Sequence, residues 1–427
     1  MIETPAAQDF AAASRGESRW RRLAILLWTT LAIAFCVKTA LNPRAHSVFP
    51  IFYEAACDWR TGRSLYPESQ ATFGGFLYSP VFALVGVPLS YLPLSAAGMV
   101  FNCASLAFLY TALRGFFRRI VVAWRPSFSE GRFLALCALG TVQGAWSAQS
   151  NALILALVLS CVTALADRRF WRAAFLLALA INIKVYPVII GCLLCVKYGR
   201  QFAWRLPAAT ALIAAAPFVF DASRAMIDYR EWIDMLAERE ALHIRYTGYR
   251  DAWTIWEQTV GTPDFAVYKF AQAGAGLAVL SWCVRNARQG WSNERWLVST
   301  FAWWTMWQLL FGPGTERLTY GILAPVATLA VMETHARGRR FGPTDVAWWL
   351  TGLLGTGEVE KALLNAWPGA RLYVPCGVVV LAAWSVANEW HDRARTTYEE
   401  SSEADVISFP TRRASDAPAR RVGRRAA

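Results

Sequence analysis

Between Leu23 and Trp390 the chain alternates apolar segments with short loops rich in arginine. In hydrocarbon, a long apolar segment satisfies its backbone polar groups by forming a helix, and ~20 residues cross a bilayer core of ~30 Å. The composition, with 56% hydrophobic and 17% charged residues, is too apolar for one water-soluble core. The sequence therefore predicts an all-α, polytopic integral membrane protein. The segments that best fit a crossing are Leu23–Val37, Ala97–Phe117, Leu206–Phe220 and Leu372–Val386.

The positions of the basic residues predict the orientation. Arginine and lysine gather in five loops, and cytoplasmic loops of membrane proteins carry such an excess. The loops between them carry nearly balanced charge and are assigned to the outer face of the inner membrane. Both termini are then cytoplasmic, and the net charge of +13 needs no nucleic-acid partner. The basic loops are 114–132, 168–172, 197–205, 285–295 and 337–340, and the outer loops are 41–96, 221–264, 312–317 and 358–371.

Three parts follow from this pattern: a cytoplasmic segment over residues 1–22, a membrane domain over 23–390, and a disordered, basic, cytoplasmic tail over 391–427. We expect about twelve helices, including short or re-entrant ones. The segment Tyr78–Leu94 contains three prolines and is predicted not to cross. Ala173–Asn182 and Val188–Val196 are predicted to be two short helices.

The first outer loop has the pattern of an amphipathic helix. Phe49, Phe52 and Ala56 recur at helical spacing, while Glu54 and Asp58 point elsewhere, so a short helix lying on the membrane is expected. An offset of four residues places the two carboxylates on one face. They either share a site or form a surface ion-pair set with Arg60 and Arg63.

Five short motifs of the chain match those of a known family: Tyr53-Glu54-Ala55-Ala56, Trp59 to Tyr66, Tyr78-Ser79-Pro80, Gln149-Ser150-Asn151 and Lys184-Val185-Tyr186-Pro187. With these motifs the chain resembles glycosyltransferase family 87, a family of the GT-C superfamily, over roughly residues 20–390. The resemblance implies the GT-C fold with amphipathic helices in its outer loops. It also implies transfer of a hexose, most plausibly mannose, from a polyprenyl phosphate to a lipid or glycan acceptor, with no cofactor and no metal ion.

One departure from the family affects the catalytic base. The family has an aspartate about five residues before the Tyr-x-Ala-Ala motif, and Ser47 or Val48 occupies that place here. Asp58 and Glu54 are the nearest carboxylates, and His46 is a third candidate that is assigned to substrate binding. An acceptor hydroxyl needs such a base to remove its proton.

Lys184 is the predicted ligand of the donor phosphate. An ammonium in an apolar stretch is costly unless a counter-charge or water reaches it, so a lipid phosphate is a natural partner. Alternatively, Lys184 extends to the lipid headgroups. Gln149 and Asn151 lie between two helices, where their amides either hold sugar hydroxyls or cap the helix 151–166.

A second informative loop contains Gly312-Pro313-Gly314, which predicts a tight turn, followed by Glu316 and Arg317. Arg317 is a second candidate for phosphate binding, and Glu316 for orienting the substrate or taking the acceptor proton. A salt bridge within the turn is the alternative.

These observations predict a membrane hexosyltransferase in which Asp58 or Glu54 is the base and Lys184 and Arg317 neutralise the departing phosphate. The chain has no Walker loop or His-Glu-x-x-His motif, so a soluble nucleotide-sugar donor and a zinc site are not expected. Two alternatives remain open: a flippase for lipid-linked sugars, and an inactive family member in an envelope complex.

Overall fold

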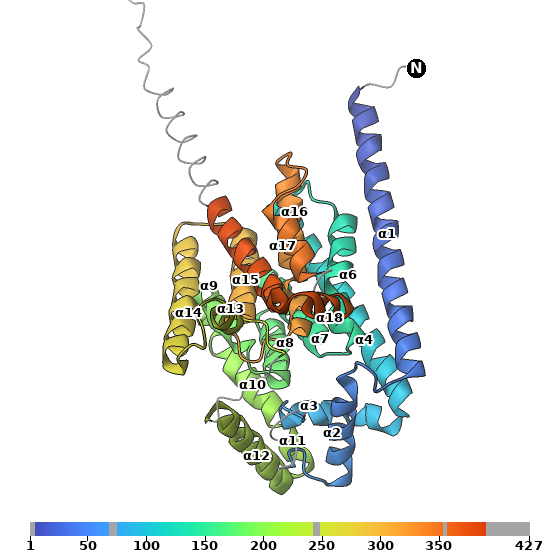
Figure 1. Ribbon diagram of the computed structural model, residues 1–427, viewed down its shortest axis with the longest axis vertical. Helices are drawn as coiled ribbons and strands as arrows, with labels where there is room; N and C mark the ends of the chain where they lie inside the picture. Colours follow the sequence, from blue (N-terminus) through green and yellow to red (C-terminus); the bar gives the residue numbers. More distant parts are fainter. Residues whose placement is uncertain (1–4, 68–74, 242–247, 353–356, 390–427) are drawn as a thin grey trace, which may run out of the picture. The chain divides into compact units, whose positions relative to one another are not determined.

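The computed structural model describes residues 5–67, 75–241, 248–352 and 357–389 of the chain (Figure 1). Within these ranges the regular elements are helices, and the β-type pairing is one isolated antiparallel bridge between Tyr249 and Glu316. The chain divides into two compact units, Met1–Ala382 and Ala383–Ala427, and the candidate site lies in the first. The tail predicted over 391–427 lies outside the described residues.

The all-α class is confirmed, and the described residues contain more helical segments than the twelve expected because several rods are interrupted. The α-helices are α1 Pro5–Leu41, α2 Phe49–Thr61, α3 Pro80–Gly86, α4 Leu94–Phe116, α5 Val122–Trp124, α6 Glu130–Trp146, α7 Asn151–Ala166, α8 Phe170–Ile183, α9 Val188–Phe202, α10 Arg205–Ala214, α11 Ala216–Phe220, α12 Ala222–Ala241, α13 Ala252–Thr259, α14 Phe265–Arg288, α15 Asn293–Phe311, α16 Ala324–Ala336, α17 Pro343–Thr351 and α18 Gly357–Ala366. Four other segments have 3-10 or π geometry: η2 Val87–Tyr91, η3 Phe117–Val121, η4 Arg317–Leu323 and η5 Pro368–Leu372. A further helix covers Tyr373–Glu389.

Two of the described helices are long and apolar enough to cross a membrane. The first covers Gly16–Leu41 and the second Leu94–Trp124, with mean hydropathies of 1.9 and 1.5. A third crossing is possible if α9 with α10–α11, which bend by 101°, form one broken span. The bend lies between α9 and α10, so the expected helix over Leu206–Phe220 is present as the arm Arg205–Phe220 of this pair. One residue with helical φ and ψ angles, Ala215, separates α10 from α11.

Other predicted segments agree with the structure. The first outer loop forms α2, whose aromatic side chains Phe49 and Phe52 are buried. The predicted pair of short helices is present as α8 and α9, which meet at Lys184. The segment after Tyr78 is a short α-helix followed by a 3-10 turn, as its prolines favour.

The central helix of the first unit is α7, which is buried on all sides. It packs against α4 and α8, while α6 packs against α1. A helix buried all round has to be apolar all round, and between Asn151 and Ala166 the polar side chains are confined to a serine, a threonine and the Asn151 amide. This packing leaves the N-terminus of α7 at the place where α6 ends and α8 meets α9.

The two ends of α6 differ in charge. At its N-terminus, the carboxylate of Glu130 accepts hydrogen bonds from Arg114 and Arg118, both at 2.9 Å, and lies 3.8 Å from Arg21. Its C-terminus leads to Gln149. At 1.5 Å per residue the two ends are about 24 Å apart. The arginines around Glu130 and the segment containing Gln149 therefore lie at opposite ends of the helix.

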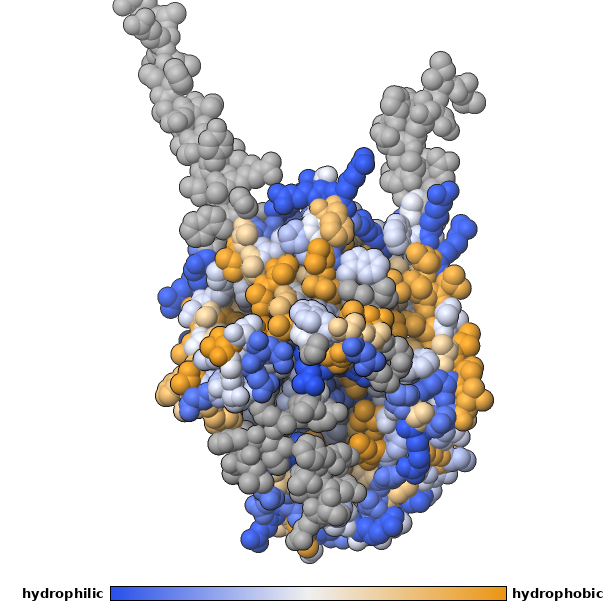
Figure 2. Space-filling view, viewed as in Figure 1, coloured by the Kyte–Doolittle hydropathy of each residue, from blue (hydrophilic) through white to orange (hydrophobic). Residues whose placement is uncertain are grey.

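Exposed apolar side chains line the longest helix. Along α1 the exposed residues include Leu26, Ile33 and Val37, all more than half exposed. Figure 2 shows such hydrophobic residues along this helix at the right-hand side of the view. Such a surface is unfavourable in water and favourable in the hydrocarbon of a membrane.

A close approach of backbones holds α1 against α6. A Cβ atom added at Gly131 would lie 2.4 Å from the backbone nitrogen of Arg21, so only glycine fits without a shift. The backbone N–H of Gly131 also donates to the Glu17 carboxylate at 3.0 Å.

We expect Gly131→Ala to destabilise the detergent-solubilised protein by about 1–3 kcal/mol, because overpacking forces backbones apart. The measurement is the melting temperature by differential scanning fluorimetry. Gly115→Ala is the matched control: Gly115 is also helical but has open space around it, so alanine is expected to be neutral or slightly stabilising there. Equal melting temperatures for the two variants would contradict the contact.

Candidate functional site

Lys184 lies in the break between α8 and α9. The preceding helix ends at Ile183, and Lys184 is extended, with φ −136° and ψ 136°. Pro187 occupies the N-cap of α9 and restricts the residue before it, so the chain cannot continue α8 through this point. The break turns the Lys184 side chain toward the N-terminus of α7.

Two amide oxygens and an aromatic ring hold the ammonium group of Lys184. Its Nζ donates to Oδ1 of Asn151 at 2.9 Å and to Oε1 of Gln149 at 3.3 Å. The Tyr78 ring lies beneath it, with 5.5 Å between Nζ and the ring centroid. These partners are neutral, and no described carboxylate is within 4 Å of Nζ. The cation is fixed in position by neutral groups, which do not cancel its charge.

Burial changes the acidity of this ammonium. Lys184 lies in a loop, where burial lowers its pKa to about 8 and the charge of Glu316 opposes the shift. A pKa near neutrality means that the group is still largely protonated at pH 7. Its two amide partners hold the ammonium group at the N-terminus of α7.

Asn151 joins Lys184 to the loop after α15. Its Nδ2 donates to the carbonyl of Leu318 at 3.2 Å and to Oγ1 of Thr319 at 3.4 Å. The helix-capping interpretation is wrong, since Ser150 occupies the N-cap of α7 and makes no side-chain cap bond. Both ends of the Asn151 amide are used to connect segments that are distant in sequence.

The turn that carries Gln149 is strained. Ala148 has a φ of +49°, and a left-handed conformation costs a residue with a Cβ about 1–2 kcal/mol. The backbone N–H of Gln149 donates to the carbonyl of Gly144 at 3.2 Å and closes the end of α6. The turn directs the Gln149 side chain at Lys184.

Glu316 lies in the loop before η4, next to Arg317, and both are half-buried. The loop is anchored on each side: Glu316 pairs with Tyr249, and the backbone N–H of Arg250 donates to Thr315 at 2.8 Å. Burial raises the pKa of the Glu316 carboxyl, and the charges of Lys184 and Arg317 oppose this. Glu316 lies beside the same site, because Asn151, which holds Lys184, also bonds Leu318 and Thr319 shortly after it. No hydrogen bond joins the side chains of Glu316 and Lys184 in the described residues.

The first-loop carboxylates lie in separate surface ion pairs. Glu54 accepts from Arg44 at 2.8 Å, and Asp58 accepts from Arg63 at 2.9 Å. Burial raises the pKa of Asp58, while Arg63 opposes the shift and Glu54 adds to it. The two carboxylates thus share a face, as predicted, but each has its own arginine. Arg60 contributes to neither pair, because it donates to the carbonyl of Ser90 and lies over the Tyr91 ring.

His46 takes part in the structure through its backbone. Its carbonyl accepts from Nζ of Lys38 at 3.1 Å, and the same Nζ donates to the carbonyl of Trp146 at 3.1 Å. The φ of His46 is +48°, which turns the chain between α1 and α2. His46 therefore lies near Trp146, at the C-terminus of α6. Gln149 follows Trp146 closely in the sequence.

Tyr78 belongs to the site, although sequence reasoning used it only as a motif residue. Its ring contacts Phe52 of α2 and Phe82 of α3, with centroid distances of 4.9 and 5.1 Å. Its hydroxyl lies 3.4 Å from Oγ of Ser150. In the sequence, Tyr78 is marked by the Tyr-x-Pro motif that precedes α3. Its ring contacts both Phe52 of the first outer loop and the ammonium group of Lys184.

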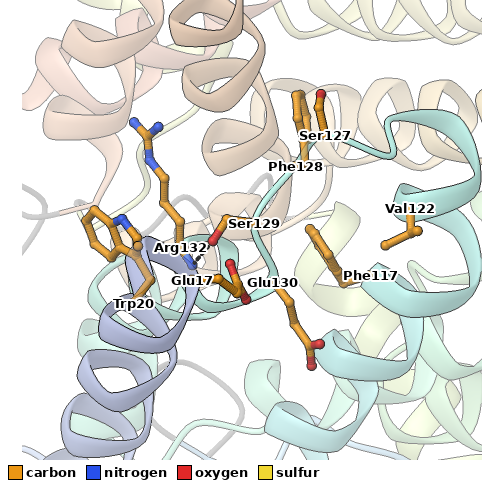
Figure 3. A pocket seen from close by; sticks show the side chains of 10 residues that line it. Glu17, Trp20, Phe117, Val122, Ser127, Phe128, Ser129, Glu130 and Arg132 are labelled. Atoms are coloured by element: carbon orange, nitrogen blue, oxygen red, sulfur yellow. Dashed lines mark hydrogen bonds between the residues drawn. The ribbon is translucent and has the colours of Figure 1, made fainter. Parts of the chain in front are cut away.

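A pocket of about 500 Å³ lies at the other end of α6 (Figure 3). Glu17 and Trp20 of α1 form one side, and Phe117 and Val122 the other. The hydroxyl of Ser129 in its wall caps α6 by accepting from the backbone of Arg132. This pocket contains none of the predicted site residues, so it is separate from the Lys184 cluster.

The sequence was compared with the patterns of known protein families, and one family matches. The pattern of glycosyltransferase family 87 matches residues 76–313, more than half of the chain. The chain belongs to glycosyltransferase family 87. It is accordingly a membrane glycosyltransferase, and the resemblance noted from its motifs is confirmed at the level of the family. No curated protein matches the sequence.

The family 87 match includes most of the cluster. Tyr78, Gln149, Asn151 and Lys184 lie within it, whereas the first-loop motifs lie before its first residue. Glu316 follows its last residue by three positions. The matched segment therefore contains Lys184 and the three side chains that contact its ammonium group, those of Tyr78, Gln149 and Asn151.

Proposed function

We propose that this family 87 protein transfers a hexose, most plausibly mannose, from a polyprenyl phosphate to a lipid or glycan acceptor at the outer face of the inner membrane. The observation that carries the proposal is the ammonium of Lys184, fixed by Asn151 and Gln149 without an ion-pair partner. A lipid-linked phosphate supplies the missing negative charge. The donor's tail would stay in the bilayer, next to the apolar helices.

Orientation in the membrane supports the same proposal. The arginine cluster around Glu130 and the Lys184 cluster lie at opposite ends of α6. If the arginines face the cytoplasm, Lys184 faces outward, where a polyprenyl-linked sugar is the kind of donor that remains membrane-bound. Both termini are cytoplasmic in this arrangement.

The charges define the roles of the side chains. Lys184, with Arg317 beside Glu316, would neutralise the phosphate as it leaves. Gln149 and Asn151 hold Lys184 in place and have amide groups suited to sugar hydroxyls. A fixed cation stabilises the leaving group without reorganising during the reaction, which is the main electrostatic contribution to such a transfer.

The carboxylate that we favour as base is Glu316. Its charge interacts with Lys184, and the described residues form no hydrogen bond with its side chain. Asp58 and Glu54, the bases favoured by the sequence, are each paired with an arginine. A base needs a free lone pair and a pKa that is not too far below the working pH, and burial raises the pKa of the Glu316 carboxyl in that direction.

In the reaction, the acceptor oxygen attacks the anomeric carbon while the bond from that carbon to the phosphate oxygen breaks. The acceptor proton moves to the Glu316 carboxylate, and the electron pair of the broken bond leaves with polyprenyl phosphate. The proton is later released to water. The products are the glycosylated acceptor and polyprenyl phosphate.

The test is release of polyprenyl phosphate by the purified protein in nanodiscs that contain polyprenyl-phosphate [³H]mannose and a cell-envelope extract as acceptor source. We expect the lipid phosphate and a labelled acceptor to appear together. In proteoliposomes, label that crosses the bilayer unchanged would favour the flippase alternative. Donor that neither reacts nor crosses, with several sugars, would favour an inactive family member.

A further inference from the structure

An exposed apolar stripe runs along α12, in the second of the long outer loops. Met226, Ile233 and Leu236 are 63%, 57% and 37% exposed. Met226 and Ile233 are seven residues apart and Ile233 and Leu236 are three apart, so the three lie along one side of the helix. The helix as a whole is polar, which distinguishes it from the membrane-crossing helices.

The stripe is not the face by which α12 packs on the protein. On the opposite side, Arg224 pairs with the buried Asp228 at 3.2 Å and lies over the Trp59 ring at 5.0 Å. The same guanidinium donates to the carbonyl of Asp58 at 3.1 Å. Trp232 donates to the carbonyl of Leu77, next to Tyr78, at 3.2 Å. The packed face is therefore complete without the stripe.

The stripe continues the surface of the preceding helix. Val219 and Phe220, at the end of α11, are 83% and 71% exposed and complete the bent apolar segment that begins at α9. The ring of Phe218 stacks on Tyr229 with 5.8 Å between centroids, and the Tyr229 hydroxyl donates to Ala214 at 2.8 Å. Exposed apolar side chains are thus present both at the end of α11 and on α12, and the contact of Phe218 with Tyr229 joins the two helices.

We propose that α12 lies on the phospholipid surface of the membrane, with Met226, Ile233 and Leu236 inserted at the boundary of headgroups and acyl chains. A helix of low overall hydrophobicity with one apolar face binds in this way, at a depth of about 5–10 Å. The exposed Asp234 and Glu238 lie on a different face of the helix and stay in water. The occupant is lipid, since α12 directly follows the exposed apolar end, Val219 and Phe220, of the bent segment formed by α9 to α11.

This contact would position the first outer loop. Because Arg224 of α12 holds the backbone of Asp58 and the ring of Trp59, a helix fixed on the membrane also fixes α2. Figure 1 shows α12, α11, α3 and α2 together at one end of the first unit. The inference concerns the membrane contact alone and does not depend on the proposed transfer reaction.

The experiment uses the full chain in nanodiscs of phosphatidylglycerol and phosphatidylethanolamine. A benzophenone amino acid is placed at Ile233, at Glu238 on the same helix, and at Val100, an exposed position of the apolar rod Leu94–Trp124. After irradiation, adducts are identified by intact-protein mass spectrometry. We expect lipid adducts at Ile233 and Val100, and at least fivefold less at Glu238.

Two outcomes would overturn the proposal. Lipid adducts at Val100 without any at Ile233 would place the stripe away from the bilayer. A cross-linked dimer from Ile233 would assign the stripe to a second copy of the chain. Each variant is irradiated only if its melting temperature in the nanodiscs matches that of the parent, so a variant that has lost its fold is not scored.

Discussion

Replacing Lys184 with methionine is expected to lower the rate of polyprenyl phosphate release by about 10²–10³-fold, the usual effect of removing one group that stabilises developing charge. Methionine keeps the length and apolar stem of the side chain and removes only the cation. Nothing else in the cluster supplies a positive charge fixed by Asn151 and Gln149. The measurement is single-turnover release from labelled donor in nanodiscs.

The matched control is Lys197→Met. Lys197 resembles Lys184 in its contacts: its Nζ donates to the carbonyl of Trp291 at 3.2 Å and lies 5.5 Å from the centroid of the Trp296 ring. It is distant in the chain from Gln149 and Asn151. We expect release within twofold of the parent for Lys197→Met, and equal losses in the two variants would mean that methionine damages the fold.

The pH dependence follows from the same lysine. Its pKa of about 8 means that the cation is present below this pH and is lost as the pH rises through it. We expect kcat/KM, which reports the free enzyme, to fall above about pH 8. In Lys184→Met this alkaline limb should be absent. A parent profile that stays flat to pH 10 would show that the ammonium does not bind the donor.

The second large effect is expected for Glu316→Gln, with a loss of about 10²–10⁴-fold in transfer if this carboxylate takes the acceptor proton. Glutamine keeps the size of the side chain but cannot accept the proton. Asp58→Asn is the comparison, since Asp58 is tied to Arg63, and its rate is expected to stay within about threefold of the parent. The opposite order of losses would return the base to the first outer loop.

The acidic limb of the profile provides a further check. Burial raises the pKa of Glu316, so its basic form is present above that raised value and is lost as the pH falls through it. Lys184 and Arg317 face this carboxylate and oppose the shift, and the Tyr78 hydroxyl also interacts with it. Glu316→Gln should remove the acidic limb while leaving the alkaline limb of Lys184.

Lys184→Met and Glu316→Gln are expected to differ in their affinity for the donor lipid. If Lys184 binds phosphate, Lys184→Met should weaken binding of polyprenyl phosphate at least tenfold, whereas Glu316→Gln should leave it unchanged or strengthen it, since a negative charge is removed. Titration of the nanodisc-embedded proteins with fluorescent polyprenyl phosphate measures this. Equal binding by both variants and the parent would contradict the assignment of Lys184.

The sequence by itself determined the class of fold and the position of the lysine. A series of apolar segments with arginine between them permits a helical membrane protein, because hydrocarbon demands that backbone groups be satisfied within each segment. Pro187 after Lys184 predicted a break between two helices, and the structure has it there. The family could also be recognised from short motifs, since Tyr78, Gln149, Asn151 and Lys184 occur in them.

Only the tertiary structure decided which of these groups meet. Helical periodicity assigned Glu54 and Asp58 to one face, yet their charges pair with Arg44 and Arg63, because the turn into α2 and the loop after it bring arginines to the surface. The contact of Lys184 with Asn151 joins positions 33 residues apart, and the bond from Asn151 to Leu318 joins positions 167 apart. Such contacts depend on how α7 packs between its neighbours. Local residue patterns contain no information about that packing, since the energy that selects it comes from burying whole helix faces together.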